Sequence, residues 1–212
     1  MAVMIEFAVS RLMAMMMGHP VCRCFLASQR GVAAIEFAMI MPVLLILFLS
    51  SFDVGNAIIA YLKVRTATYE LAAITNQYGT GSTAQISAST MSAITAATSQ
   101  VMAPYSSSST TVTISQIRAG SASSATVSWS YSPNGTGLTQ GATYSGLPAN
   151  MAKNSCNNKY PCYFILSSVS YTYTPLFGHY MTGPLTLSDT LLVTPRVSTC
   201  VQYNNVPAST CP

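Results

Sequence analysis

Residues 32–52 read VAAIEFAMIMPVLLILFLSSF, an apolar stretch interrupted by a single charge, Glu36. As an α-helix this stretch would be about 31 Å long, enough to cross a hydrocarbon core of about 30 Å. A secretory signal peptide is the rival interpretation, but its apolar region usually has only about 7–15 residues and ends in a small-residue cleavage site. Here the stretch runs straight into Asp53, with helical patterning beyond it. We therefore predict a transmembrane helix over residues 32–52.

Basic residues predict the direction in which this helix crosses the membrane. Arg11, Arg23 and Arg30 all precede the apolar stretch. Because Lys and Arg are enriched on the cytoplasmic side of membrane helices, we expect residues 1–31 to be a cytoplasmic leader and the chain after the helix to be exported.

Only 7% of the 212 residues are charged, against a typical value of about 25%. The residues that replace the charged ones differ between two parts of the chain. Met, Ala, Leu and Ile replace the charged residues near the amino terminus, and Ser, Thr, Asn, Gln and Tyr replace them after about Gly79. The net charge of +4 comes from nine scattered Lys and Arg residues. Nucleic-acid binding needs a basic patch that neutralises several phosphates, so we expect no nucleic-acid partner.

Two residues inside the apolar stretch have both a structural and a functional interpretation. An unpaired carboxylate there costs at least a few kcal/mol, so Glu36 is either a tolerated charge about one turn inside the membrane edge or the partner of a cation at the same depth. Pro42 removes a backbone hydrogen bond and can bend the helix. That bend either has no role or serves the packing of subunits.

Residues 30–42 read RGVAAIEFAMIMP, in which a Gly follows a basic residue and a Glu stands five positions after that Gly. This pattern, with the long apolar helix, resembles the processing site of type IV prepilins. The longer string at 30–72, RGVAAIEFAMIMPVLLILFLSSFDVGNAIIAYLKVRTATYELA, resembles the TadE-like pseudopilin family of tight-adherence (Flp-type) pilus systems. A looser likeness extends to SYTYTPLFG at 170–178 and LLVTPRVS at 191–198.

The resemblance implies that a prepilin peptidase cuts between Gly31 and Val32. The new amino group of Val32 would then pair with Glu36 of a neighbouring subunit, with Glu36 and Pro42 serving subunit assembly. The implied partners are the membrane, other pilin or pseudopilin subunits, the peptidase and a pilus assembly platform. The implied location is the bacterial inner membrane, spanned once, with the carboxy-terminal domain periplasmic or extracellular.

Beyond the membrane the apolar pattern predicts that the helix continues over residues 53–78 as a stem. Ile58, Leu62 and Tyr69 approximate helical spacing, and the Tyr78–Gly79 step provides a stop signal. We expect one helix of about 45 residues, running from near Val32 to about Gln77, whose outer part packs beside other subunits, on its own domain, or both.

We predict that residues 79–212 form a Ser/Thr-rich α+β domain in which helix packs against a small antiparallel sheet. A linker is expected at 79–83, and a second helix at 84–102. Period-two alternation or apolar runs predict strands around 112–117, 125–131, 162–173 and 186–194. Four aromatic residues of the predicted strands have two interpretations: Trp129, Tyr131, Tyr171 and Tyr173. They could form a sugar-binding platform, but we favour the interpretation that they pack half-buried on the strands.

The six cysteines divide by predicted compartment. Cys22 and Cys24 lie in the leader, where a reducing cytoplasm keeps thiols free, whereas four cysteines are exported: Cys156, Cys162, Cys200 and Cys211. An even number on the oxidising side indicates two disulfides, for which three connectivities exist. We favour Cys156–Cys162 and Cys200–Cys211. A metal site is the rival, but no pair has C-x-x-C spacing and no Cys stands near the exported His179, so we expect no metal.

The exported part offers few catalytic groups. Its acids are Asp53, Glu70 and Asp189, and a Ser–His179–Asp189 set is conceivable only by residue count because no G-x-S-x-G elbow is present. We expect no enzymatic activity and no cofactor. Two functions remain open: a minor pilin or pseudopilin of a tight-adherence pilus, and an uncleaved membrane-tethered binding module.

Overall fold

The computed structural model describes residues 30–78, 84–178 and 183–203. The chain divides into two compact units, Met1–Phe52 and Asp53–Pro212. Helix α3, Arg30–Gln77, contributes to both units and has 48 residues. It confirms the prediction of one long helix that ends at about Gln77.

In the first unit, helix α3 presents an apolar surface that its own chain does not cover. Residues 31–48 are all exposed, although most of their side chains are apolar. The most apolar window of the helix has none of its surface buried, and among the described residues this helix alone is long and apolar enough to cross a membrane. A helix of a soluble core would be mostly buried, so this segment requires a cover outside its own fold.

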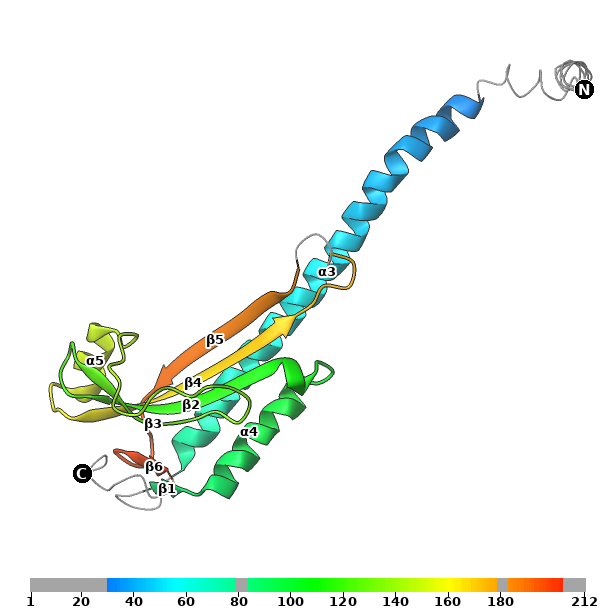
Figure 1. Ribbon diagram of the computed structural model, residues 1–212. Coiled ribbons are helices and arrows are strands. Elements are labelled where there is room, and N and C mark those ends of the chain that lie inside the picture. Colours follow the sequence, from blue (N-terminus) through cyan, green and yellow to red (C-terminus); the bar gives the residue numbers. More distant parts are fainter. Residues whose placement is uncertain (1–29, 79–83, 179–182, 204–212) are drawn as a thin grey trace, which may run out of the picture. The chain divides into compact units, whose positions relative to one another are not determined.

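The second unit contains a four-stranded antiparallel sheet with the strand order β3-β2-β4-β5 (Figure 1). Its strands are β2 (Thr110–Ala119), β3 (Ala125–Tyr131), β4 (Cys162–Tyr173) and β5 (Leu185–Val193). All four lie where the sequence pattern predicted strands. The α+β fold class is therefore confirmed, with a long amino-terminal helix followed by an antiparallel sheet.

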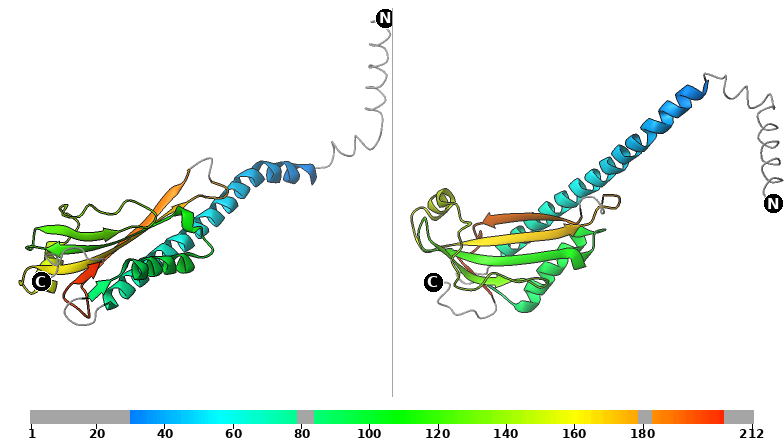
Figure 2. Two further views of the ribbon diagram at one scale, coloured as in Figure 1. Left: turned by 60° about the horizontal axis from the view of Figure 1, so that its bottom comes forward. Right: turned by 45° about the horizontal axis from the view of Figure 1, so that its top comes forward.

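Two helices cover one face of this sheet (Figure 2). They are the part of α3 after Asp53 and helix α4, Ala88–Met102. Their apolar side chains form one core with the inward side chains of the strands, such as Val112, Ile114, Trp129, Ile165 and Val169. Alternate residues of a strand point to the same face, which explains why the period-two pattern located the strands.

Helix α4 is shorter than the predicted helix at 84–102. Residues Ala84–Ile86 instead form strand β1, and helix α4 begins after Ser87, whose hydroxyl accepts a hydrogen bond from the Thr90 amide at 3.2 Å. A serine at this position satisfies one of the free amides of the first turn and so sets the start of the helix.

Strand β1 pairs in parallel with strand β6, Val201–Tyr203, near the carboxy-terminal end of the domain. The sequence pattern did not predict this pair, because a strand of three residues is too short to show a period. Two buried side chains of the main sheet hold β6 in place. The Trp129 indole donates to the Val201 carbonyl at 2.7 Å, and the Gln116 amide oxygen accepts from the Val201 amide at 2.8 Å.

The other face of the sheet is covered at one end by helix α5, Ala149–Cys156, and by neighbouring loop residues. The loop after β3 approaches this face closely. A Cβ added at Gly135 would lie 2.5 Å from the Thr111 methyl group, and one at Gly137 would lie 2.9 Å from the Ser130 hydroxyl. Glycine at these two positions therefore lets the loop backbone lie against the strands.

The stem part of α3 packs on its own domain through small and medium-sized side chains. The buried positions are Ala60, Val64, Ala67 and Leu71. In contrast, Ile58, Leu62 and Tyr69 are 55%, 53% and 46% exposed. The small side chains allow a close approach of the helix to the sheet, and the large apolar ones remain on the outside.

Candidate functional site

The predicted processing and assembly residues all lie near the start of helix α3. Gly31, Val32, Glu36 and Pro42 are helical and exposed. Val32 and Glu36 are four residues apart and so share one face of the helix. The fold makes no steric demand for glycine at position 31, because a Cβ there would meet nothing within 4 Å.

The start of helix α3 has a distinctive exposed surface. It is an exposed apolar helix with one carboxylate, Glu36, and a glycine that packing does not require. Residues 31–73 match the family model of TadE-like proteins. The predicted resemblance to the TadE-like family is thereby confirmed over these residues. Searches of curated proteins and of solved structures found no match.

The TadE-like segment begins at Gly31 and ends on the stem. The looser likeness at 170–178 and 191–198 lies outside it: the first range covers the end of β4 and the loop after it, and the second covers the end of β5 and the residues that follow. The family match therefore covers the helix, while the sheet domain is outside the matched residues. Within residues 30–78, 84–178 and 183–203, α3 is the one helix that could cross a membrane, and it supports single-pass anchoring.

Within the TadE-like segment, the stem binds its own domain through polar contacts as well as apolar ones. The Lys63 ammonium donates to the carbonyls of Val101 at 3.3 Å and Ala103 at 2.5 Å, at the carboxy-terminal end of α4. A cation is favourable there because the last carbonyls of a helix lack partners and carry partial negative charge. The Ser167 hydroxyl of β4 donates to the Thr68 carbonyl at 3.0 Å.

Asp53 joins the start of the stem to the loop after β4 through hydrogen bonds that the sequence did not predict. Its carboxylate accepts hydrogen bonds from the backbone amides of Leu176 at 3.1 Å, Phe177 at 2.9 Å and Gly178 at 2.6 Å. The residue is only 6% exposed. The Tyr173 hydroxyl also donates to the Asp53 carbonyl at 3.3 Å. A buried carboxylate is stabilised by such donors, so Asp53 fixes the loop after β4.

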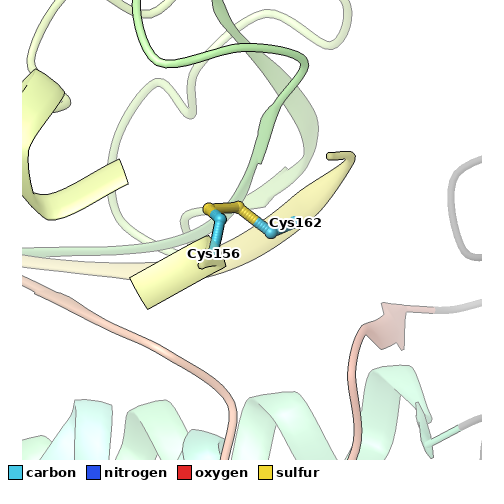
Figure 3. Close-up of a disulfide and its surroundings, with 2 residues drawn as sticks. All are labelled: Cys156 and Cys162. Carbon is cyan, nitrogen blue, oxygen red and sulfur yellow. A yellow bond between two sulfur atoms is a disulfide. The ribbon is translucent and has the colours of Figure 1, made fainter. Parts of the chain in front are cut away.

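A disulfide joins Cys156, at the end of α5, to Cys162, at the start of β4 (Figure 3). It is the pair that we favoured from the sequence. Cys200 is also disulfide-bonded. Because Cys211 lies outside the described residues, the Cys200–Cys211 pair stays a prediction; Cys22 and Cys24 lie outside them too.

A cavity of about 370 Å³ lies beside the Cys156–Cys162 bond, and its lining includes Lys159, Tyr163 and Ser198. Asp189 lies on β5 opposite Val169, while His179 is outside the described residues. In the described part of the chain, no three His, Cys, Asp or Glu side chains are grouped so that they could hold a metal ion.

The aromatic residues of the strands pack inside the domain, as the favoured interpretation expected. Trp129, Tyr171 and Tyr173 are buried, and Tyr131 is half-buried with its ring centroid 5.6 Å from that of Tyr203. Burial raises the pKa of Tyr171, Tyr173 and Tyr203 above the ordinary tyrosine value. These rings therefore contribute to the core and do not form an exposed platform.

Proposed function

We propose that this protein is a minor pilin or pseudopilin, a structural or assembly component of a tight-adherence type IV pilus. The observation that carries the proposal is the family match, which begins at Gly31 on an exposed apolar helix. In this proposal the helix is a membrane anchor before assembly and a packing element afterwards. Its orientation places the leader in the cytoplasm and the sheet domain outside the inner membrane.

The proposed processing step is cleavage of the Gly31–Val32 bond by a prepilin peptidase. Its product would carry an α-amino group on Val32, one helical turn from the Glu36 carboxylate. A cation at this depth, on a neighbouring subunit, would offset the cost of a carboxylate in an apolar environment. Gly31 is the first residue of the family match, which supports a role for this glycine in recognition by the peptidase.

The outer face of the stem supports a role in assembly. Ile58, Leu62 and Tyr69 form an apolar surface that the domain does not bury. Contiguous exposed apolar surface commonly marks a protein–protein contact. We propose that this surface and the span pack against the helices of other pilin or pseudopilin subunits and of the assembly platform.

The test is N-terminal mass spectrometry of the protein recovered from membranes and, separately, from sheared pili. We expect a chain that begins at Val32 in the wild type and an intact leader in Gly31→Leu. Gly55→Leu is the matched control, because Gly55 lies on the same helix and a Cβ there also meets nothing within 4 Å. An intact leader on the mature wild-type protein would instead favour an uncleaved, membrane-tethered binding module.

A further inference from the structure

The end of the sheet domain that is tied to Asp53 carries an unusual concentration of exposed apolar side chains. Leu176 is 71% exposed, Phe177 is 45% exposed, and Leu185, at the start of β5, is 51% exposed. Val54, next to Asp53 on α3, is 58% exposed. We call these four residues the membrane-proximal cluster. In the described chain beyond α3, the other exposed large apolar side chains are Tyr78, Leu138 and Val197, which are 36%, 38% and 52% exposed.

Three contacts bring this cluster to the level of Asp53. The Asp53 carboxylate binds the amides of Leu176 and Phe177 directly. Tyr173 donates to the Asp53 carbonyl, and Leu185 is the residue opposite Tyr173 in the β4–β5 register. Asp53 itself directly follows the apolar stretch at 32–52. With a rise of about 1.5 Å per residue, a helix that crosses a bilayer over that stretch leaves Asp53 at the lipid–water boundary.

The Asp53 carboxylate is already hydrogen-bonded, so contact of this end with lipid headgroups and upper acyl chains does not leave that charge without partners. The Asp53 carboxylate has three amide donors. Residues 174–178 contain no charged side chain, and neither do residues 183–185. Apolar side chains held at this depth gain free energy by entering the boundary between headgroups and acyl chains, where aromatic residues are enriched.

We propose that the 174–178 loop is a second membrane contact, in which Leu176 and Phe177 insert into the outer boundary of the bilayer while Asp53 holds the loop against the helix. The occupant of the cluster is therefore lipid, and the contact sets how the sheet domain sits on the membrane. This proposal requires that residues 32–52 span the bilayer. It requires neither cleavage at Gly31 nor entry into a pilus.

The experiment uses the full chain reconstituted in phosphatidylcholine vesicles that contain lipids brominated either near the carbonyl end or near the methyl end of the acyl chain. Phe177→Trp places a fluorophore in the loop, and Leu176→Trp is the second variant. Leu138→Trp is the matched control at an exposed apolar site outside the cluster. Trp129, only 2% exposed, is present in every variant, and its emission in the wild type gives the background.

We expect bromine near the carbonyl end to quench most of the added emission of Phe177→Trp, and bromine near the methyl end to quench less. Leu138→Trp should keep its emission with both lipids. Adding Asp53→Ala to Phe177→Trp should reduce the quenching, because the loop loses its three amide contacts. Equal quenching of the loop and Leu138 variants, or none at all in the loop, would overturn the proposal. Cofractionation of the wild type with vesicles and the mass of its amino terminus report the span and the processing step separately.

Discussion

Glu36 is the only charged side chain in the stretch at 32–52. It is exposed on the helix, and residues 32–52 of the same chain offer it no opposite charge. A carboxylate can remain there if a neighbouring molecule supplies a cation, and removal of such a charge pair would weaken each subunit contact. In the proposed function, Glu36 would therefore be a side chain on which the contact between subunits depends.

Glu36→Gln should insert in the membrane and fold as the wild type does, yet be depleted from sheared pili by about tenfold or more, since a loss of about 1.4 kcal/mol per contact changes an equilibrium tenfold. Quantitative immunoblots of the membrane and sheared fractions would measure this. Glu70→Gln is the matched control, because Glu70 is an exposed acid on the same helix. Wild-type recovery of Glu36→Gln in the sheared fraction would contradict the assembly role.

Strand β6 shows how one buried side chain can attach a distant element. Gln116, fully buried in β2, accepts from the Val201 amide and donates to the Cys200 sulfur at 3.1 Å. A hydrogen bond to a buried amide side chain adds little to the free energy of unfolding. Removing that side chain costs more, because the Val201 amide is shielded from water and is left without an acceptor. The attachment of β6 therefore depends on Gln116 and the neighbouring Trp129 contact.

Gln116→Leu should lower the free energy of unfolding by about 1–3 kcal/mol, because the Val201 amide loses its acceptor inside the domain. Urea denaturation of the full chain in detergent would measure the loss, and faster hydrogen exchange at Val201 would locate it. Gln100→Leu makes the same change at an exposed position of α4 and should leave both quantities near those of the wild type. Unchanged exchange at Val201 in Gln116→Leu would show that this contact does not hold β6.

At the scale of the whole molecule, the stability of the domain depends partly on buried tyrosines whose neutral form the folded state favours. Burial raises the pKa of Tyr144, Tyr171, Tyr173 and Tyr203 above the ordinary value of 10.0, and the Asp53 charge adds to the effect at Tyr173. The unfolded chain thus loses these protons at a lower pH than the folded chain does. Their contribution to stability is fully present below about pH 10 and is lost as the pH rises through the folded-state values.

These tyrosines should therefore not change the urea concentration at the midpoint of unfolding up to about pH 10. Above that pH, their ionisation should lower it. Tyr171→Phe should make the alkaline fall less steep, because one fewer buried phenol ionises on unfolding. Tyr78→Phe, at an exposed tyrosine, provides the comparison. A fall of the same steepness in Tyr171→Phe and the wild type would exclude Tyr171 from this effect.

The sequence predicted the elements better than it predicted their contacts. The long helix and four strands followed from an apolar run and from alternation, which are local signals. The Asp53 site joins residues more than a hundred positions apart, and nothing in either segment alone indicates the other. The sequence left open which face of the stem packs on its own domain. Close approach of the helix decides this, so Ala60 and Ala67 are buried, whereas larger residues such as Ile58 and Leu62 are exposed.

The pairing of β1 with β6 also has a consequence for the order in which the domain folds during synthesis. The first strand of the sheet domain and its partner are separated by more than a hundred residues, and Gln116 and Trp129 bind the later one. A chain that leaves the ribosome with its amino-terminal part first has Gln116 and Trp129 in place long before Val201 is made. The β1–β6 pair can therefore form only after nearly the whole domain has been synthesised, and a chain shortened before Val201 would leave the Trp129 indole and the Gln116 amide without this partner.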